Sequence, residues 1–366
     1  METRKLSPTK KTSSELKKIK VNNTFDSKFM MIFIPFLCSI IVILFVPYLL
    51  TQYNVFNWGF SEKDGVIGDT IGGTMGPFIA IGAAILTFLA FWVQYKANEQ
   101  QKKDLKIERF ENKFYELLRL HKANLEEMHI GNSLQGRRCF VPMFYELKCC
   151  YNTCKSFLDS INIMDKARYE YDKFDLMDFV YTIFFFGIGI NSEKHFIHKL
   201  TKAEKHLFEL VKPFLESIQN KASNHFLSDS KIPYYIFNLP LSGIYDEHTV
   251  EFYYVPFDGH LHRLGHYYRH LFQTAKYVIT QDHDMIDPKE QYEYIKTLRA
   301  QLSDFEQLLL YYNALAWFDT DWRILFTRYR LIKNMPVALA TMDQSPLIHF
   351  ADEIRELKKE NINIFD

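Results

Sequence analysis

The sequence has no excess of charge of either sign, since 44 Lys and Arg balance 44 Asp and Glu among its 366 residues. A global attraction to nucleic acid is therefore excluded, and any basic surface must be local. Cysteine is also scarce, and its five copies are Cys38, Cys139, Cys149, Cys150 and Cys154. Their odd number and their clustering speak against a secreted disulfide framework. Because "CCYNTC" has no second ligand pair at zinc-site spacing, structural thiols in a reducing compartment are favoured over a metal site.

Two stretches of the chain lack charged residues altogether. The run 29–50, "FMMIFIPFLCSIIVILFVPYLL", has 22 residues, and the run 71–93 has 23. Each exceeds the ~20 residues that a helix needs to cross a bilayer. The apolar part of the first run is too long for a signal peptide. The sequence therefore predicts a two-helix transmembrane hairpin, with the lipid bilayer as its first partner.

The positions of Lys and Arg predict how this hairpin is oriented. Residues 1–28 carry eight of them, the stretch after the second run carries five, and the connecting segment 51–70 has only Lys63. Since positive residues stay on the cytoplasmic side, both termini are expected there. The expected parts are a basic cytoplasmic tail (1–28), transmembrane helix 1 (29–50), a short extracytoplasmic loop (51–70), transmembrane helix 2 (71–93), a helical stalk (94–130) and a cytoplasmic helical domain (131–366).

A glycine-rich stretch, "GDTIGGTMGP", opens the second run and invites comparison with phosphate-binding loops. It has no Lys for a P-loop, and Ile71 stands where a dinucleotide fingerprint needs its first glycine, so no cofactor is predicted. Small residues instead recur every four positions, at Gly68, Gly72, Gly76, Ala80 and Ala84. On a helix in lipid they form a close-packing stripe. The stripe predicts packing against the first span, or a self-association seam or pore lining in a homo-oligomer.

The cytoplasmic part reads as mainly α-helical. Helices are expected at 260–280, at 289–317 and at 319–333, while the apolar stretch 180–191 is too short to span a membrane and is expected in the core. "YYIFNL" and "TVEFYYV" are rich in aromatic and β-branched residues and are separated by "PLSGIYDEH", so a small β-hairpin is expected within 231–257.

The densest group of polar side chains lies in "FDGHLHRLGHYYRHLFQ", residues 257–273. Helical geometry puts His262, His266 and Arg269 opposite the apolar face, with Arg263 and His270 beside them. A polar face for a neighbouring helix is one interpretation. A metal site is another, although a third ligand is missing and none is predicted. The third is catalysis by Arg263, Arg269 and His270, because an Arg with a His shortly downstream resembles the motif of the HEPN superfamily of metal-independent ribonucleases.

A second polar row lies in "LRAQLSDFEQLLLYYNALAW", residues 298–317. Arg299, Glu306 and Asn313 recur every seven residues along the expected helix 289–317. This row could pair with the Arg and His face of the preceding helix. Buried ion pairing is one interpretation, and a ligand or catalytic pocket, which could take RNA or a nucleotide, is the other.

Four segments in order resemble the putative phage abortive infection proteins, an AbiC-like family. They are "GDTIGGTMGPFIAIGAAILTFLAFWVQYKANEQQ", "FENKFYELLRLHKANL", "FDGHLHRLGHYYRHLFQTAKYV" and "LRAQLSDFEQLLLYYNALA", within 60–130 and 250–320. The resemblance implies bacterial antiviral defence, in which an unknown phage trigger activates the protein and the host stops growing or dies before phage is released. Together with the predicted spans, this places the protein in the bacterial inner membrane. The resemblance supplies no catalytic residue set.

Three functions follow from these observations. The favoured hypothesis is a non-enzymatic membrane effector, in which the cytoplasmic domain senses infection and oligomeric hairpins disrupt or permeabilise the inner membrane. The first alternative is a membrane-tethered HEPN-like ribonuclease or nucleotide-acting effector that uses Arg263 or Arg269 with His270. The second alternative is a sensor or scaffold that recruits another effector.

Overall fold

The computed structural model describes residues 64–131, 134–228, 234–236 and 250–365, together with Cys38, Ile41 and Phe45. The chain divides into two compact units, Met1–Gln101 and Lys102–Asp366. The predicted first span, 29–50, lies outside the described residues except for those three, which are helical. The predicted tail 1–28 also lies outside them. The two-helix hairpin therefore stays a prediction.

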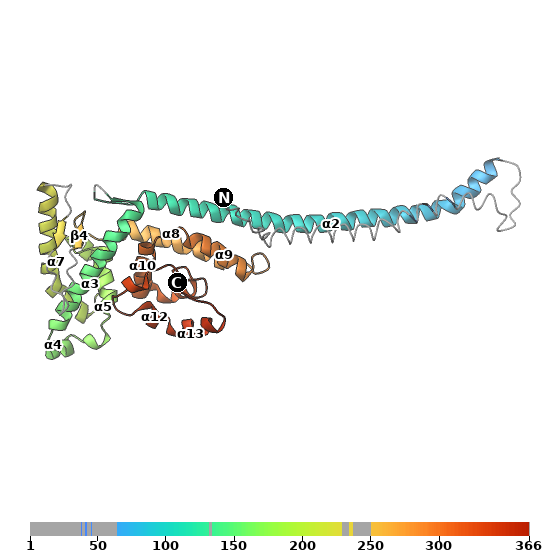
Figure 1. Cartoon of the computed structure of the whole chain (residues 1–366). Coiled ribbons are helices and arrows are strands. Elements are labelled where there is room, and N and C mark those ends of the chain that lie inside the picture. Colours follow the sequence, from blue (N-terminus) through green and yellow to red (C-terminus); the bar gives the residue numbers. More distant parts are fainter. Residues whose placement is uncertain are drawn as a thin grey trace, which may run out of the picture. The chain divides into compact units, whose positions relative to one another are not determined.

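The described part of unit 1 consists mainly of the helix α2 (Asp64–Glu126), which begins in this unit and ends in unit 2 (Figure 1). It starts seven positions before the predicted second span and continues through most of the predicted stalk. Within the described chain, one helix is long and apolar enough to cross a membrane, and it is the part of α2 from Gly72 onward. The side chains of Phe78, Phe88 and Phe91 are about two-thirds exposed (66%, 67% and 66%). The uncharged segment 71–93 of this helix has the length and composition of a membrane span.

Unit 2 is mainly helical, with two short antiparallel strand pairs, which confirms the mainly α-helical part of the expected fold class. Its described elements after α2 are β1 (His129–Ile130), β2 (Leu134–Gln135), η1 (Gly136–Cys139), α3 (Phe140–Ser160), α4 (Ile163–Arg168), η2 (Tyr171–Lys173), α5 (Leu176–Phe186), α6 (Ile190–Phe196), α7 (Lys202–Ser228), β3 (Tyr234–Ile236), β4 (Val250–Phe252), α8 (Leu261–Ile279), α9 (Pro288–Arg299), α10 (Asp304–Asn313), η3 (Ala314–Phe318), α11 (Asp319–Thr327), η4 (Val337–Leu339), α12 (Pro346–His349) and α13 (Ala351–Lys359).

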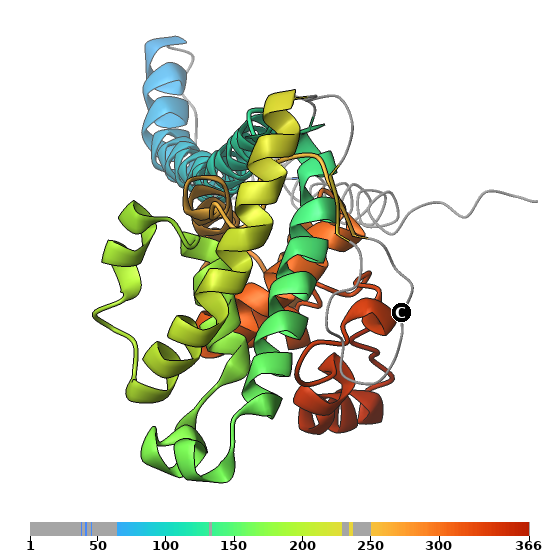
Figure 2. The same ribbon diagram turned by 90° about the vertical axis from the view of Figure 1, so that its left-hand side faces the viewer.

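Helix α3 is central to the core, where it packs against α5 and α7 (Figure 2, green and yellow). Helix α5 is mostly apolar, and Val180, Ile183 and Phe184 are completely buried in it. The side chain of Asp175 caps its first turn by accepting a hydrogen bond from the backbone N–H of Asp178 at 3.0 Å. The expected core position of this stretch is therefore confirmed.

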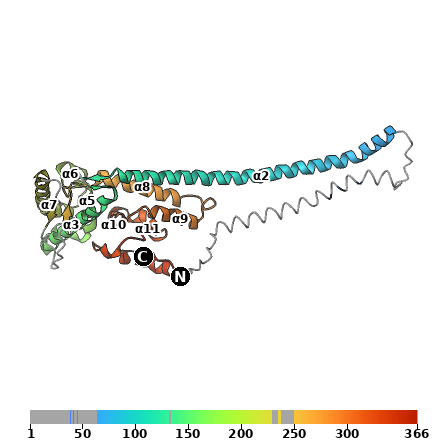
Figure 3. The same ribbon diagram turned by 45° about the horizontal axis from the view of Figure 1, so that its top comes forward.

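The part of α2 that belongs to unit 2 lies beside α8 and α9 (Figures 1 and 3). The Phe110 ring stacks on Tyr277 of α8, with centroids 5.2 Å apart, and meets Tyr294 of α9 edge-on at 5.0 Å. Phe114, one turn further on, is completely buried. Aromatic contacts of this kind add to the free energy gained from burial, so this end of α2 is part of the core.

The predicted β-hairpin is present as β3 and β4, with Tyr234 opposite Phe252. The expected single helix over 289–317 was wrong, because α9 ends at Arg299 and α10 begins at Asp304. Ser303 breaks it: its hydroxyl accepts from the backbone N–H of Glu306, and the Glu306 carboxylate accepts from the backbone N–H of Ser303. This capping box starts a new helix.

Candidate functional site

A turn with two left-handed residues places the start of α8 against the end of α5. Phe257 has φ +61° and Gly259 has φ +88°. A Cβ atom on Gly187 would lie 2.6 Å from the backbone carbonyl of Asp258, so the two segments meet backbone to backbone. Glycine suits so close an approach because it lacks a Cβ. The contact holds His260, the N-cap residue of α8, in the interior.

The centre of the buried polar cluster beneath this turn is Glu146 of α3, whose exposure is 0%. Its carboxylate accepts hydrogen bonds from the backbone N–H of Phe257 at 2.7 Å, from His260 Nε2 at 3.1 Å and from the Tyr254 hydroxyl. Three donors compensate a charge that burial disfavours. Burial and then the Glu146 charge raise the pKa of Tyr254 well above its ordinary value, so the phenol keeps its proton and donates it.

Arg263, on the first turn of α8, extends this cluster. Its Nε donates to the carbonyl of His129 at 2.8 Å, and its Nη1 donates to the carbonyl of Gly259 at 3.1 Å. Nη1 also lies 3.4 Å from His260 Nδ1. Because a guanidinium can only donate, Nδ1 must accept, and the His260 proton then sits on Nε2 and faces Glu146. A neutral imidazole therefore joins the carboxylate to the guanidinium.

The cluster forms one wall of a pocket of about 270 Å³. The pocket combines aromatic, aliphatic and polar side chains, and its lining consists of Ile130, Gly131, Phe226, Tyr253, Tyr254, Val255, Asp258, His260 and Arg263. Asp258 is exposed and Arg263 is half-buried. Among the described residues, neither the Asp258 carboxylate nor Arg263 Nη2 has a hydrogen-bond partner. The volume is at the lower end of the range for small-molecule sites.

The three residues predicted as catalytic do not converge on one pocket in the described structure. Arg263 lines the pocket, and Arg269 is exposed on α8. His270 lies two turns beyond Arg263, and both of its ring nitrogens are buried without a partner in the described structure. General acid–base catalysis needs a nitrogen that reaches the substrate. The geometry therefore gives no support to a ribonuclease centre at Arg263 and His270.

His270 instead stacks on His121 of α2, with ring centroids 6.1 Å apart and an interplanar angle of 19°. The ring nitrogens of His121 are also buried and unpartnered within the described residues. Burial, then His270 and Arg137, lower the pKa of His121 to about 4. Burial and the neighbouring His266 lower the pKa of His270. Neutral imidazoles are thus favoured where α2 meets α8.

The predicted polar pocket or partner face consists of His262, His266, Arg299, Glu306 and Asn313. Because the helix is interrupted at 300–303, Arg299 belongs to α9, and the seven-residue row is not the face of a single helix. Arg299 Nη1 donates to the carbonyl of Arg330 at 2.8 Å. His262 and His266 are exposed on α8. No hydrogen bond or ion pair joins these histidines to the row in the described part of the chain.

Glu306 and Asn313 are both buried and have other partners. The Glu306 carboxylate accepts from the Tyr267 hydroxyl at 2.6 Å and lies 3.5 Å from Arg137 Nε. The Asn313 amide donates to the Tyr181 hydroxyl at 3.0 Å. These contacts satisfy groups inside the helix bundle.

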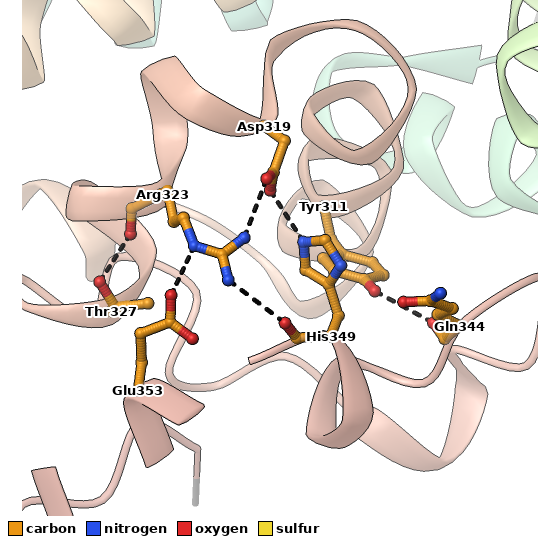
Figure 4. A network of polar contacts seen from close by, with 7 residues as sticks. All are labelled: Tyr311, Asp319, Arg323, Thr327, Gln344, His349 and Glu353. Atoms are coloured by element: carbon orange, nitrogen blue, oxygen red, sulfur yellow. Dashed lines mark hydrogen bonds and ion pairs between the residues drawn. The ribbon is translucent and has the colours of Figure 1, made fainter. Parts of the chain in front are cut away.

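A separate network joins the C-terminal helices to α11 (Figure 4). Asp319 accepts from Arg323 Nη1 at 2.9 Å and lies 2.8 Å from His349 Nε2. Arg323 also pairs with Glu353 on α13. Because carboxylates on two helices share one guanidinium, the network fastens the end of the chain to the bundle. In the described structure it borders no pocket residue.

The small-residue stripe lies on α2. A Cβ on Gly72 or Gly76 would meet no described atom within 4 Å. Ala80 and Ala84 are exposed, and Gly68 belongs to the same helix. Gly72 and Gly76 therefore face open space among the described residues. The packing partner of the stripe stays a prediction.

Sequence reasoning missed three members of the site and its surroundings, namely Glu146, Tyr254 and His121. One signal was present, because Glu146 is the single acidic residue in the otherwise apolar stretch 140–147, "FVPMFYEL". A lone carboxylate on a buried helix face needs a partner. Tyr254 and His121 resemble many other residues of their types in this sequence, and only tertiary contacts single them out. In the described part of the chain, no three His, Cys, Asp or Glu side chains gather closely enough to hold a metal ion.

Comparison with known families decides what this part of the chain resembles. Residues 259–339 match the family described as putative phage abortive infection protein. The AbiC-like resemblance is confirmed. The match runs from the turn before α8 to η4 and includes His260 and Arg263. Glu146 and the segments within 60–130 that resemble the family lie outside it. No curated protein and no solved structure matches the chain.

Proposed function

We propose that this chain is an AbiC-like membrane protein of bacterial phage defence. In this proposal the uncharged part of α2 and the run 29–50 insert into the inner membrane as an oligomer of hairpins. The cytoplasmic domain senses infection, and the rearranged hairpins then permeabilise the membrane. The family match over 259–339 supports the defence role. The observation that carries the membrane role is the apolar window of α2, of which 0% is buried.

The continuity of α2 supports the coupling between sensing and membrane disruption. This helix carries the uncharged segment in unit 1, and its last turns hold Phe114 and His121 in the core of unit 2. A helical connection between these two segments is more direct than a flexible linker would be. A change at α8 would therefore be passed to the membrane segment through α2.

The proposal is tested by following an infected culture with a potential-sensitive dye while recording RNA integrity. Wild type is compared with Gly76→Leu, which places a bulky side chain on the stripe, and with Phe78→Leu as a matched control on the same helix. We expect depolarisation before growth arrest in wild type and Phe78→Leu. Gly76→Leu should lose both depolarisation and protection, because bulk prevents close helix approach.

Two outcomes would contradict the proposal. If the membrane potential is intact when growth stops, the protein does not act by permeabilising the membrane, and early RNA loss would then favour the ribonuclease alternative. If Gly76→Leu protects as well as wild type does, the stripe has no role in the effector step. A chain that protects only together with another host or phage-defence protein would favour the scaffold alternative.

A further inference from the structure

The pocket beside Glu146 carries hydrogen-bonding groups that the fold itself does not use. Arg263 is fixed by the carbonyls of His129 and Gly259, yet its Nη2 donors have no partner among the described residues. Asp258, which lines the same pocket, is exposed and has no described partner for its carboxylate. A rigid donor and a free acceptor therefore line one cavity. Fixed groups of this kind bind a ligand with little loss of entropy.

The charges of the pocket favour an uncharged polar group over a strongly anionic one. Arg263 supplies one positive charge, but Asp258 adds a negative charge, and Glu146 lies behind His260 at 3.1 Å. In the described structure no carboxylate forms an ion pair with Arg263. The site is thus suited to a molecule that accepts hydrogen bonds from the guanidinium and donates others to the carboxylate.

The remaining walls favour a flat ring. Phe226, Tyr253 and Tyr254 line the pocket together with Ile130. Gly131 lets its backbone approach that of Tyr253 closely, since a Cβ on Gly131 would lie 2.9 Å from the Tyr253 carbonyl oxygen. Aromatic side chains bind planar heterocycles by stacking. The volume of about 270 Å³ is on the scale of a small molecule such as a nucleoside.

We propose that this pocket binds the guanine base of a nucleoside or nucleotide. Guanine presents O6, which can accept from the unpartnered Nη2 of Arg263, and its neighbouring N1–H and N2–H donors match the two oxygens of a carboxylate. Adenine and cytosine each lack one of these features, and uracil lacks an exocyclic amine. The inference deepens the proposed sensing role of the cytoplasmic domain, and it rests on that proposed function for its biological meaning.

The test is isothermal titration calorimetry on the full chain in detergent, with guanosine, adenosine, cytidine and uridine as probes. We expect guanosine to bind most tightly. Asp258→Asn should raise the dissociation constant of guanosine by about 5- to 150-fold, which is the range for loss of one good base contact. Arg263→Gln should abolish binding, whereas Arg269→Gln, an exposed arginine on the same helix, should leave it unchanged.

Several results would overturn the inference. They are no binding of any nucleoside to wild type, equal binding of all four, or guanosine binding that survives both Asp258→Asn and Arg263→Gln. Binding of inorganic phosphate in place of nucleosides would also overturn it. Asp258→Asn removes no described hydrogen bond, and circular dichroism verifies that it is folded. The outcome is independent of the depolarisation assay, so either proposal can fail while the other holds.

Discussion

The stacked histidines where α2 meets α8 make the stability of the protein sensitive to acid. His121 is 1% exposed, and its ring nitrogens have no partner among the described residues. Its ring also lies against Tyr267, with centroids 4.9 Å apart, whose hydroxyl is bonded to Glu306. The charged or titratable groups around it are His270, Arg137 and, behind Tyr267, Glu306. No described carboxylate pairs with His121, so a proton there has nothing to compensate it.

The sign of the effect follows from the pKa of His121, which burial and then His270 and Arg137 lower from 6.5 to about 4 in the folded protein. Below pH 6.5 the unfolded chain binds a proton that the folded chain does not. The free energy of unfolding is therefore not reduced by this group above pH 6.5, and it falls as the pH drops from 6.5 toward 4. The loss is on the order of 2 kcal/mol at pH 5 and 3 kcal/mol at pH 4.

The perturbation is His121→Phe, which keeps a planar ring and removes the titrating nitrogens. The free energy of unfolding is measured by urea unfolding of the full chain in detergent. We expect the variant-minus-wild-type difference to be about 2 kcal/mol larger at pH 5 than at pH 7, because only wild type is destabilised by acid at this position. His283→Phe, at an exposed histidine between α8 and α9, is the matched control and should show no such gain.

The comparison must use the difference between variant and wild type. Asp178 has the opposite sign, because burial, with Asp175 and Glu204, raises its pKa from 3.8 to about 6, and the folded state then gains protons as the pH falls through 6. That contribution cancels in the difference. A difference that stays flat from pH 7 to 4.5 would refute the account given for His121.

Two further predictions concern the site. Glu146→Ala should lower the free energy of unfolding by about 3–5 kcal/mol, because the donors from Tyr254, Phe257 and His260 lose a buried charged partner. Glu146→Gln should lower it by less. Equal losses for the two variants in urea unfolding would contradict this account. Gly259→Ala should lower stability by at least ~2 kcal/mol, since its Cβ would clash with the Phe186 carbonyl at φ +88°. Gly265→Ala, whose Cβ would meet Phe185 at an ordinary 3.5 Å, should raise the melting temperature slightly, and similar shifts for both glycines would show that the backbone contact is unimportant.

Periodic patterns in the sequence predicted the helices well because each pattern is local. The exposed side of α8, with His262, His266 and Arg269, follows from helical spacing alone. The error at 289–317 arose because apolar residues continue in register through the break, while the capping box at Ser303 depends on side-chain hydrogen bonds.

The site itself could be predicted only in part. Arg263 was a candidate from the start, but its neighbours Glu146 and Tyr254 are about 110 residues apart from each other in sequence (|i−j| of 108). Nothing local marks them as partners. Likewise, Arg263 and His270 share a helix, yet the fold directs one to a pocket and the other to His121.

By itself, the sequence determined the helical class, the uncharged run from 71 to 93 and the resemblance to abortive infection proteins, because composition and spacing need no partner to be read. The tertiary structure decided which polar groups become a site. It buried Glu146 under the α8 turn and set His260 between that carboxylate and Arg263. It also brought His121 against His270. Burial and charge pairing depend on contacts between distant segments, and these exist only once the chain has folded.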